Sequence, residues 1–340
     1  IEDILPSTPT EVAKVASTVI LNSVNSTIID RIAIGNNNII KADNNSNSIL
    51  IADSSNNIKY SNSNNNTFEL WSNLSYNHSF NLNDSKKNIG SISFTIGGEY
   101  NYYIGNKNNN SNSNKVGLAY SYSNANWGSY RAHTLALYSN INLDNNDINF
   151  ITTIADFGIL NTKEVRNSNS SNININHNYS TKVLSLVNTF GHNIRLNDNN
   201  IITPKVTLGY SYIARDSYNN NIDIKMDKLS LHIITPAIGL DYQSYINRSK
   251  TLSLRTSINI KYDINLTKET NNTISFYNNT INNTLIYNRS DVNNFNTELS
   301  LALNYYNPLY PNLKLSANGY ISYGKNSDNY INVGIGVEGR

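Results

Sequence analysis

Charged side chains stand opposite apolar ones in a series of alternating segments, and they are the residues of this chain that offer chemistry. Acidic and basic groups are mixed on these faces, as they would be in the lining of a pore. We expect them, with one tryptophan that shares this placement, to face the inside of a barrel. The expected lumen-facing residues are Trp71, Glu99, Lys205, Asp241, Arg255, Lys261, Asp263, Glu298, Lys314 and Glu338.

The histidines do not form a catalytic arrangement in the sequence. His78, His133, His177, His192 and His232 are scattered, and none lies in a recognisable nucleophile motif. A hydrolase would need a triad or a pair of acids at one place, so each histidine is better explained as a loop or wall residue. We therefore expect no enzymatic activity, no catalytic residues, and no cofactor or metal site. The absence of cysteine excludes a thiolate metal site and a disulfide framework.

Length and composition narrow the class of protein. The chain has 340 residues, a formal net charge of +2 and 24 tyrosines, with a mean hydropathy of −0.44. No run of about 18 apolar residues occurs, which excludes a transmembrane helix. Near-neutral charge without a basic cluster argues against nucleic acid as a partner. The chain starts at Ile1 without a signal-peptide pattern, so we expect a mature or excised piece of a longer protein.

The elements that must position these side chains are strands, and the clearest lies at the chain end. Between 331 and 337 every odd position is apolar and every even one is small or polar, which is the period of a strand with one apolar face. The same alternation recurs from Thr67 onward and predicts about twelve strands. The fifth, near 147–160, and the sixth, near 179–196, are apolar on both faces in places, so their phase stays open.

One break in phase occurs in the eighth predicted strand. Leu229, Leu231 and Ile233 lie on odd positions, whereas Pro236 and the apolar residues after it lie on even ones. An extra residue would switch the two faces, so the pattern predicts a β-bulge or a bend near 234–235.

The lengths and ends of these strands favour a membrane barrel over a soluble sandwich. Many predicted strands have about 10 to 15 residues, whereas globular strands average about 5 to 6 and a tilted strand crosses a bilayer with about 9 to 11. Tyrosines cluster at strand ends, as aromatic girdles at both lipid interfaces require. Short turns near 197–200 and 247–250 alternate with long polar excursions at 161–178 and 265–291. An even strand number places both barrel ends on the side of the short turns, which is the periplasm in bacterial barrels. A tyrosine-rich soluble β-protein is the alternative.

The segment before the strands has a different period. Residues 7–11 supply a hydroxyl cap, a proline and an acid, as helix starts do, and apolar residues then recur at three- and four-residue steps up to Ile32. We predict a helix over 9–34, although the β-branched runs at 17–20 and 26–29 also suit strands. The predicted divisions of the chain are 1–34, a helical segment; 35–66, a polar linker; and 67–340, the barrel.

Twelve strands enclose a lumen of intermediate size. About eight strands leave an interior that side chains fill, and about 16 to 18 leave an open channel, so twelve suit one α-helix about 10 to 12 Å wide. The helix at 9–34 would be about 39 Å long and is expected to cross and plug the barrel. Its apolar stripe does not suit a polar lumen, unless part of it packs on Trp71. The polar residues of this helix that we expect at the wall are Glu11, Lys14, Asn22, Asn25, Asp30 and Arg31.

The order of a helix, a strand that carries Leu70-Trp71 and about twelve strands up to the chain end resembles the C-terminal translocator domain of classical type Va autotransporters. Residues 202–212 and 235–242 resemble the central strands of that family, and 319–337 resemble its last hairpin. The resemblance spans about residues 9–340 and rests on diffuse patterns.

The resemblance implies a barrel in the outer membrane of a Gram-negative bacterium that carries an N-terminal passenger to the cell surface. Such passengers often act as adhesins or other virulence factors. The implied partners are outer-membrane lipid, the passenger and the barrel-assembly machinery, and the barrel is expected to be monomeric. A stand-alone porin or channel is the main alternative, and an outer-membrane hydrolase a lesser one. The upstream helix separates these classes, since a porin has no use for it.

Two features depart from the family pattern. Family members usually end in an aromatic residue, whereas this chain ends at Arg340; position 341 would share the apolar face of the last strand, so we expect a terminal Phe, Tyr or Trp there. Some members cut themselves at an Asn-Asn pair within the helix. Here Asn22 and Asn25 stand apart and the first run, 36–38, follows the helix, so we do not expect autocleavage.

Overall fold

The computed structural model describes most of the barrel and part of the segment before it. The predicted helix before Asn22, except Ala16, and the predicted linker at 36–66 lie outside the described residues. The described residues are 16, 22–35, 67–81, 88–104, 112–126, 129–144, 148–167, 174–197, 199–219, 224–226, 228–247, 251–267, 271–278, 281–288, 294–306, 309, 313–324 and 330–339.

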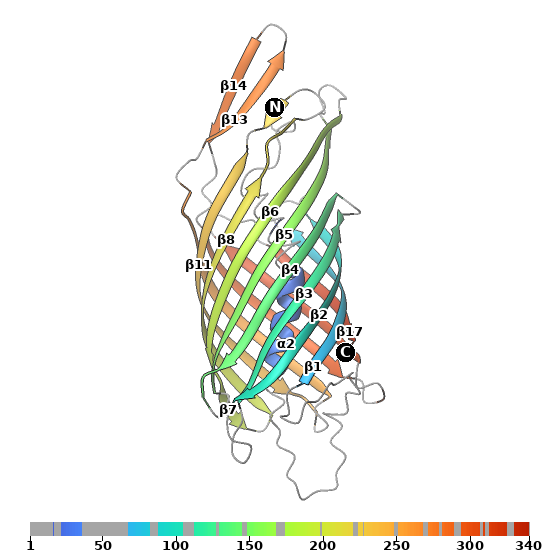
Figure 1. Ribbon diagram of the computed structural model, residues 1–340, viewed down its shortest axis with the longest axis vertical. Coiled ribbons are helices and arrows are strands. Elements are labelled where there is room, and N and C mark those ends of the chain that lie inside the picture. Colours follow the sequence, from blue (N-terminus) through green and yellow to red (C-terminus); the bar gives the residue numbers. More distant parts are fainter. Residues whose placement is uncertain are drawn as a thin grey trace, which may run out of the picture.

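Thirteen strands form one antiparallel sheet that closes on itself (Figure 1). They are β1 (Thr67–Asn81), β2 (Ile89–Ile104), β3 (Asn112–Ala125), β4 (Tyr130–Asn142), β5 (Asn149–Asn167), β6 (Asn174–His192), β7 (Ile194–Asn197), β8 (Asn200–Arg215), β11 (Leu229–Tyr245), β12 (Leu252–Asn265), β15 (Asn294–Tyr306), β16 (Leu313–Gly324) and β17 (Tyr330–Gly339). β17 pairs with β1 and closes the ring. β7 continues the line of β6, and both pair with β8, so the wall has twelve strands. The prediction of a twelve-stranded antiparallel barrel is confirmed.

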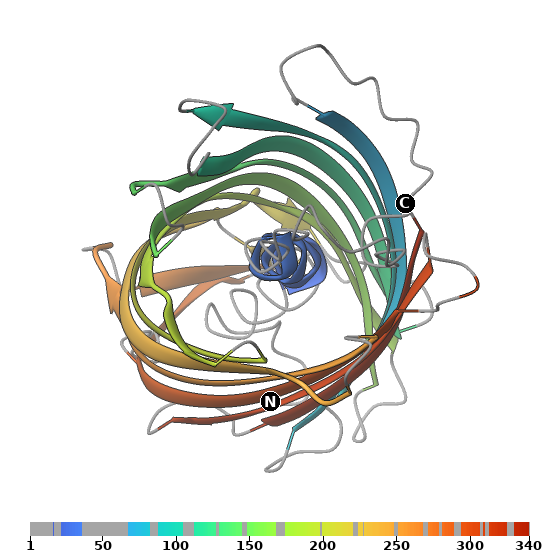
Figure 2. The same ribbon diagram turned by 90° about the horizontal axis from the view of Figure 1, so that it is seen from below.

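Among the described residues, the helix α2 (Asn22–Gly35) and a small second sheet accompany the barrel. The helix lies inside the ring of strands (Figure 2). A second sheet consists of β9 (Tyr218–Asn219), β10 (Ile224–Met226), β13 (Asn271–Asn278) and β14 (Ile281–Asn288). Within the described residues, no helix is long and apolar enough to cross a membrane.

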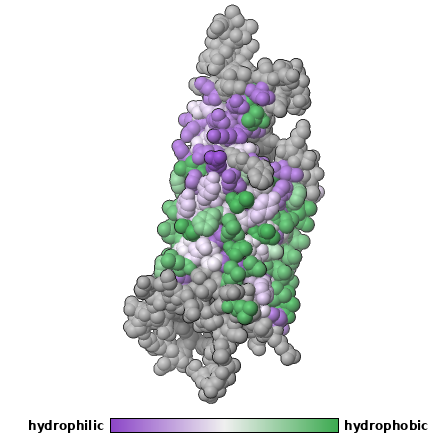
Figure 3. Space-filling view, turned by 90° about the vertical axis from the view of Figure 1, so that its right-hand side faces the viewer, coloured by the Kyte–Doolittle hydropathy of each residue, from purple (hydrophilic) through white to green (hydrophobic). Residues whose placement is uncertain are grey.

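The barrel wall is apolar outside and polar inside because each strand alternates between the two. In β4, Leu135 and Leu137 point outward and are 47% and 56% exposed, while Thr134 and Ala136 are buried in the lumen. β5 and β6, the two strands whose inward and outward faces the sequence did not define, alternate in the same way. Asp156 of β5 and Ser185 of β6 are buried, whereas Phe157 and Leu184 are exposed. The outward apolar side chains form the band seen in green in Figure 3.

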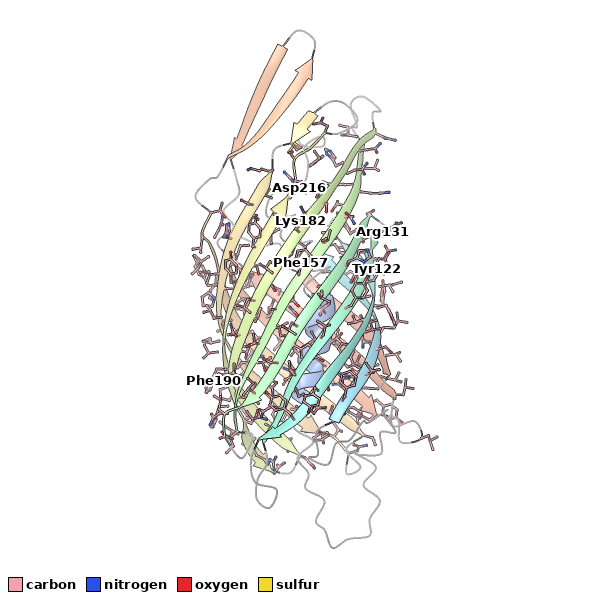
Figure 4. The ribbon with its side chains drawn as sticks, in the orientation of Figure 1. Tyr122, Arg131, Phe157, Lys182, Phe190 and Asp216 are labelled. Carbon is pink, nitrogen blue, oxygen red and sulfur yellow. The ribbon has the colours of Figure 1, made fainter. Side chains whose placement is uncertain are left out.

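A continuous row of outward side chains marks one edge of this band. The row crosses six neighbouring strands and consists of Tyr120, Leu135, Phe157, Leu184, Tyr212 and His232. The next row along the strands contains Tyr122, His133 and Lys182, and Figure 4 shows Arg131, Lys182 and Asp216 above Phe157 and Phe190. The change from apolar through aromatic to charged side chains is that expected at the surface of a bilayer.

The bulge predicted near 234–235 of β11 is wrong, although the pairing of β11 with β12 skips Thr235 and Pro236. The pairing of β11 with β8 runs without a register shift from Leu229, opposite Arg215, to Ser244, opposite Asn200. Leu229, Leu231 and Ile233 are instead buried in the lumen, and the even positions after them face outward throughout. The apparent switch of phase arises because this part of the lumen is itself apolar.

The two ends of the barrel differ in what they carry. β1 begins and β17 ends at the same end, here called the inner end (Figure 1). At the opposite outer end β5 and β6, each 19 residues long, project beyond their neighbours. The excursion predicted at 161–178 is therefore mostly strand, and that at 265–291 contains the β13–β14 hairpin. The short connections from β7 to β8 and from β11 to β12 lie at the inner end. Because the short turns of bacterial outer-membrane barrels face the periplasm, the inner end is the periplasmic one.

Candidate functional site

The helix α2 packs one face against the inside of the wall. Val24, Ile28 and Ile32 recur at four-residue steps, so they lie on one side of the helix, and all are at most 4% exposed. They form one buried cluster with the wall residues Trp71, Ala119, Ala136, Tyr138 and Ile154. The lumen therefore offers an apolar surface on β1 and β3–β5, here called the near wall. This surface answers the objection that a polar lumen would not accept the apolar stripe.

Glycines make room for the two aromatic residues of the near wall. Trp71 lies opposite Gly97 and Tyr138 lies opposite Gly117 across neighbouring strands. A Cβ atom at either glycine would overlap the facing ring. The rings can therefore lie flat along the wall, and Trp71 Nε1 donates a hydrogen bond to Tyr138 Oη over 3.2 Å.

Arg31 joins the helix to three carboxylates of the barrel. Its Nη1 lies 2.5 Å from Glu338 Oε1 on β17, and its Nη2 and Nε lie 2.9 and 3.2 Å from the two oxygens of Glu99 on β2. A longer pair of 3.5 Å reaches Glu69. The guanidinium also stacks 4.7 Å from the centre of the Trp71 ring. The Arg31, Glu99 and Glu338 side chains are 2%, 1% and 0% exposed, so this is a buried ion network.

Wall residues complete the charge balance around Arg31. Tyr138 Oη donates to Glu99 over 3.0 Å. Lys115 lies 3.4 Å from Glu99, and Lys314 lies 2.6 Å from Glu338. Three cations thus meet three carboxylates, and the buried charges compensate one another. Such a network is stabilising only while every member is present, because a buried charge that loses its partner is costly.

A second polar contact ties the helix to the wall nearer the outer end. Asn25 Nδ2 donates to Asp156 Oδ2 over 3.0 Å, and the Ser185 hydroxyl donates to the same oxygen over 2.9 Å. Asp156 is 1% exposed. The helix is therefore fixed at two heights, by Asn25 and by Arg31, with its apolar face between and around them.

The remaining charged residues of the lumen pair with one another on β8, β11, β12 and β15, here called the far wall. Asp241 accepts from Lys205 over 2.6 Å and from Arg255 over 2.7 Å. Lys261 lies 2.5 Å from Glu298. Asp263 accepts from the Thr235 hydroxyl over 2.6 Å and from Asn296 over 3.4 Å. Cations and carboxylates alternate between adjacent strands, so the far wall carries balanced charge.

The structure divides the residues expected in the lumen into two groups. Trp71, Glu99, Lys314 and Glu338 belong to the network around α2, whereas Lys205, Asp241, Arg255, Lys261, Asp263 and Glu298 belong to the far wall. Among the polar helix residues, Asn25 and Arg31 contact the wall. Asn22 and Asp30 lie in α2, but their side chains lie outside the described part, as do Glu11 and Lys14.

Sequence reasoning missed several members of these networks. Glu69 and Lys115 are charged residues on the polar face of an alternating strand, as the expected residues are, so the same pattern could have identified them. Tyr138 has no distinguishing signal among so many tyrosines. Asp156 and Ser185 lie on the two strands whose phase the sequence left open.

The histidines are bonded separately from one another. His133 Nδ1 lies 2.7 Å from Tyr120 Oη and His232 Nδ1 lies 2.8 Å from Tyr210 Oη, both on the outside of the wall. His192 is bonded to Asn149 over 2.7 Å. Among the residues that the structure describes, no three His, Asp or Glu side chains are grouped to hold a metal ion. The described arrangement is one that holds a helix inside a barrel.

Comparison with known proteins gives a family and a fold. A family model described as the autotransporter beta-domain matches residues 70–313. The translocator domain of the autotransporter NalP from Neisseria meningitidis is similar in structure, with a TM-score of 0.50 and 13% identity over 80% of this chain and 88% of that chain. The transport unit of the autotransporter AIDA-I from Escherichia coli gives a TM-score of 0.50 and 10% identity over 80% and 90%. At these identities the likeness concerns the fold. No curated protein matches the chain in sequence.

Proposed function

Because the chain belongs to the autotransporter β-domain family, we propose that α2 and the barrel work as one unit, in which the chain that leads to the passenger stays in the lumen. The family makes this protein an outer-membrane translocator of a Gram-negative bacterium that serves an N-terminal passenger. Domains of this kind are transport units, and we propose that this one has no enzymatic activity.

The observation that carries the proposal is the burial of Arg31 between Glu99 and Glu338. A cation on the helix meets carboxylates on β2 and β17, so the helix is recognised by the wall rather than merely enclosed by it. A channel that conducts solutes gains nothing from such recognition, because an anchored helix occupies the space that the solute needs. The network therefore favours a translocator over the alternative of a stand-alone porin.

The functional divisions follow from this role. We propose that residues 1–34 connect the passenger to the lumen and plug it, that 35–66 link the plug to the barrel, and that 67–340 form the membrane wall. The near wall would hold the plug at rest. The far wall, whose charges are already paired, would present a balanced surface past which a passenger of either charge can move.

The remaining partners are proposed on the same basis. The outward apolar band suits outer-membrane lipid on all sides of a single barrel, which supports a monomer. Assembly would use the barrel-assembly machinery, as for other outer-membrane barrels. The passenger would act at the cell surface as an adhesin or another virulence factor.

The test is whether the barrel exports a chain fused before Ile1. An epitope with an export signal would be placed there, and the protein produced in a Gram-negative host. We expect an antibody to label the epitope on intact cells and added protease to remove it, while a periplasmic marker stays protected. The same fusion on a separate stand-alone porin serves as the matched control and should stay inside. An epitope that remains periplasmic although the barrel is folded in the membrane would establish the porin alternative.

A further inference from the structure

The outer half of the lumen contains a second apolar surface. Lumen-facing apolar residues of seven neighbouring strands, β2–β6, β8 and β11, form one buried cluster, and all are at most 8% exposed. We call this surface the half-collar. Its residues are Ile89, Ala125, Ala132, Leu160, Val183, Ile213, Leu229, Leu231 and Ile233.

The half-collar is continuous from strand to strand. Ala132 lies opposite Leu160 across β4 and β5. Val183 lies opposite Ile213, which in turn lies opposite Leu231. The strands on the other side of the ring bring polar side chains to the lumen near the same end: Ser79, Asn296, Ser322 and Asn332, all buried. Thr162, Thr181 and Arg215 are buried beside the half-collar residues as well. The lumen-facing apolar side chains are therefore concentrated on one side of the ring, which is the better suited to an apolar partner.

One residue of the upstream chain already lies on this surface. Ala16 is 0% exposed and belongs to the same cluster as Leu231 and Ile213. In sequence it is flanked by Val12, Val15, Val19 and Ile20. These residues have the character that the half-collar accepts and that a polar lumen would reject.

We propose that the half-collar is the binding surface for the segment before α2, residues 9–21 of this chain. Apolar contact would hold this segment on one side of the lumen and exclude water from the outer half of the barrel. The near wall and the half-collar would then hold successive parts of one chain, the first by charge and apolar contact and the second chiefly by apolar contact. This inference deepens the proposed function and assumes that the upstream chain rests in the lumen.

The first test uses the absence of cysteine from the chain. Ala16→Cys would be paired in turn with Leu160→Cys, Ile213→Cys or Leu231→Cys, and membranes would be treated with a mild oxidant. A disulfide forms only when the two Cα atoms lie within about 7 Å. Because Ala16 belongs to the same buried cluster as these three residues, we expect a disulfide with at least one of them. The control pair is Ala16→Cys with Ser322→Cys on the polar side, from which we expect a yield several times lower.

The second test measures leakage through the purified full-length barrel in planar bilayers. Leu231→Asn makes the half-collar polar and is expected to raise the time-averaged conductance about tenfold, since removing a buried leucine contact changes a docking equilibrium by about this factor. Leu231→Ile keeps the apolar volume and should behave as wild type. A shift in gel mobility on boiling confirms that each variant is folded.

Each outcome decides between docking on the half-collar and another position of the segment. A half-collar disulfide, or a leak that follows polarity at position 231, supports the inference. A preferred disulfide to Ser322→Cys would overturn it. So would the absence of every half-collar disulfide together with a wild-type conductance in Leu231→Asn. If the disulfide forms but a fused epitope is never displayed, the proposed function fails and the inference stands.

Discussion

Replacing Arg31 with methionine is expected to release α2 from the near wall and open the lumen. The variant leaves Glu69, Glu99 and Glu338 with only two cations, Lys115 and Lys314. Two of these carboxylates, Glu99 and Glu338, are 1% and 0% exposed. Breaking a buried ion network by removing one partner costs about 3 to 5 kcal/mol. Single-channel recordings in planar bilayers should therefore show a larger and more frequent open state than the wild type.

Restoring the charge balance separates the ionic effect from the loss of a side chain. Arg31→Met combined with Glu69→Gln removes the carboxylate that pairs with Arg31 alone among the cations of the network. The Glu99–Lys115 and Glu338–Lys314 pairs stay in place, so this double variant should regain part of the closed state. Arg31→Lys keeps the charge but lacks the fork that reaches two carboxylates at once, and we expect an intermediate conductance. A wild-type conductance in Arg31→Met would mean that the network does not hold the helix.

Placing an arginine at Leu137 is expected to destabilise the barrel in the membrane. Leu137 points outward, is 56% exposed, and lies opposite Leu118 and Ala155 within the apolar band. Leu137 lies one row inside the edge of the band that Leu135 marks, between the interface and the bilayer midplane. An arginine on the lipid face costs about 0 to 1 kcal/mol at the interface and about 2 to 4 at the midplane, so we expect about 1 to 3 kcal/mol at Leu137. The free energy of unfolding in lipid vesicles, measured with denaturant, should fall by this amount.

Val165 provides the matched control for that substitution. It points outward and is 61% exposed, but it lies eight residues beyond Phe157 on β5, past the edge of the apolar band and toward the projecting end. Val165→Arg should leave the free energy of unfolding unchanged within about 1 kcal/mol, the value for the interface. Equal losses for both variants would show that the apolar band is placed wrongly on the wall.

The strands were predictable because two solvents act on opposite faces of the same wall. Lipid requires an apolar residue at every second position, and the lumen leaves the other positions polar. Strands such as β4 and β17 can therefore be recognised from the alternation in their sequence. The rule fails where the lumen is apolar. Leu229 and Leu231 then look like a change of phase, and the sequence suggested a bulge where the pairing of β11 with β8 has no register shift.

The site was less predictable than the wall because it depends on contacts between distant parts of the chain. Arg31 and Glu338 lie 307 positions apart, and the sequence around either residue does not indicate that the two form an ion pair. The same holds for Tyr138, which reaches Glu99 only because Gly117 leaves room for its ring. The charged residues of the far wall were identified by alternation, but their grouping apart from the helix required the closed ring.

The most direct test of a lumen held shut by the upstream chain is the conductance of the barrel with and without residues 1–34. Purified full-length protein and the deletion variant would be compared in planar bilayers at the same protein density, with boiled and unboiled gel samples confirming a folded barrel. We predict a small conductance for the full chain and a stable, larger one for the deletion, because α2 and its contacts would be gone. Equal conductances from two folded barrels would contradict a plug in the lumen.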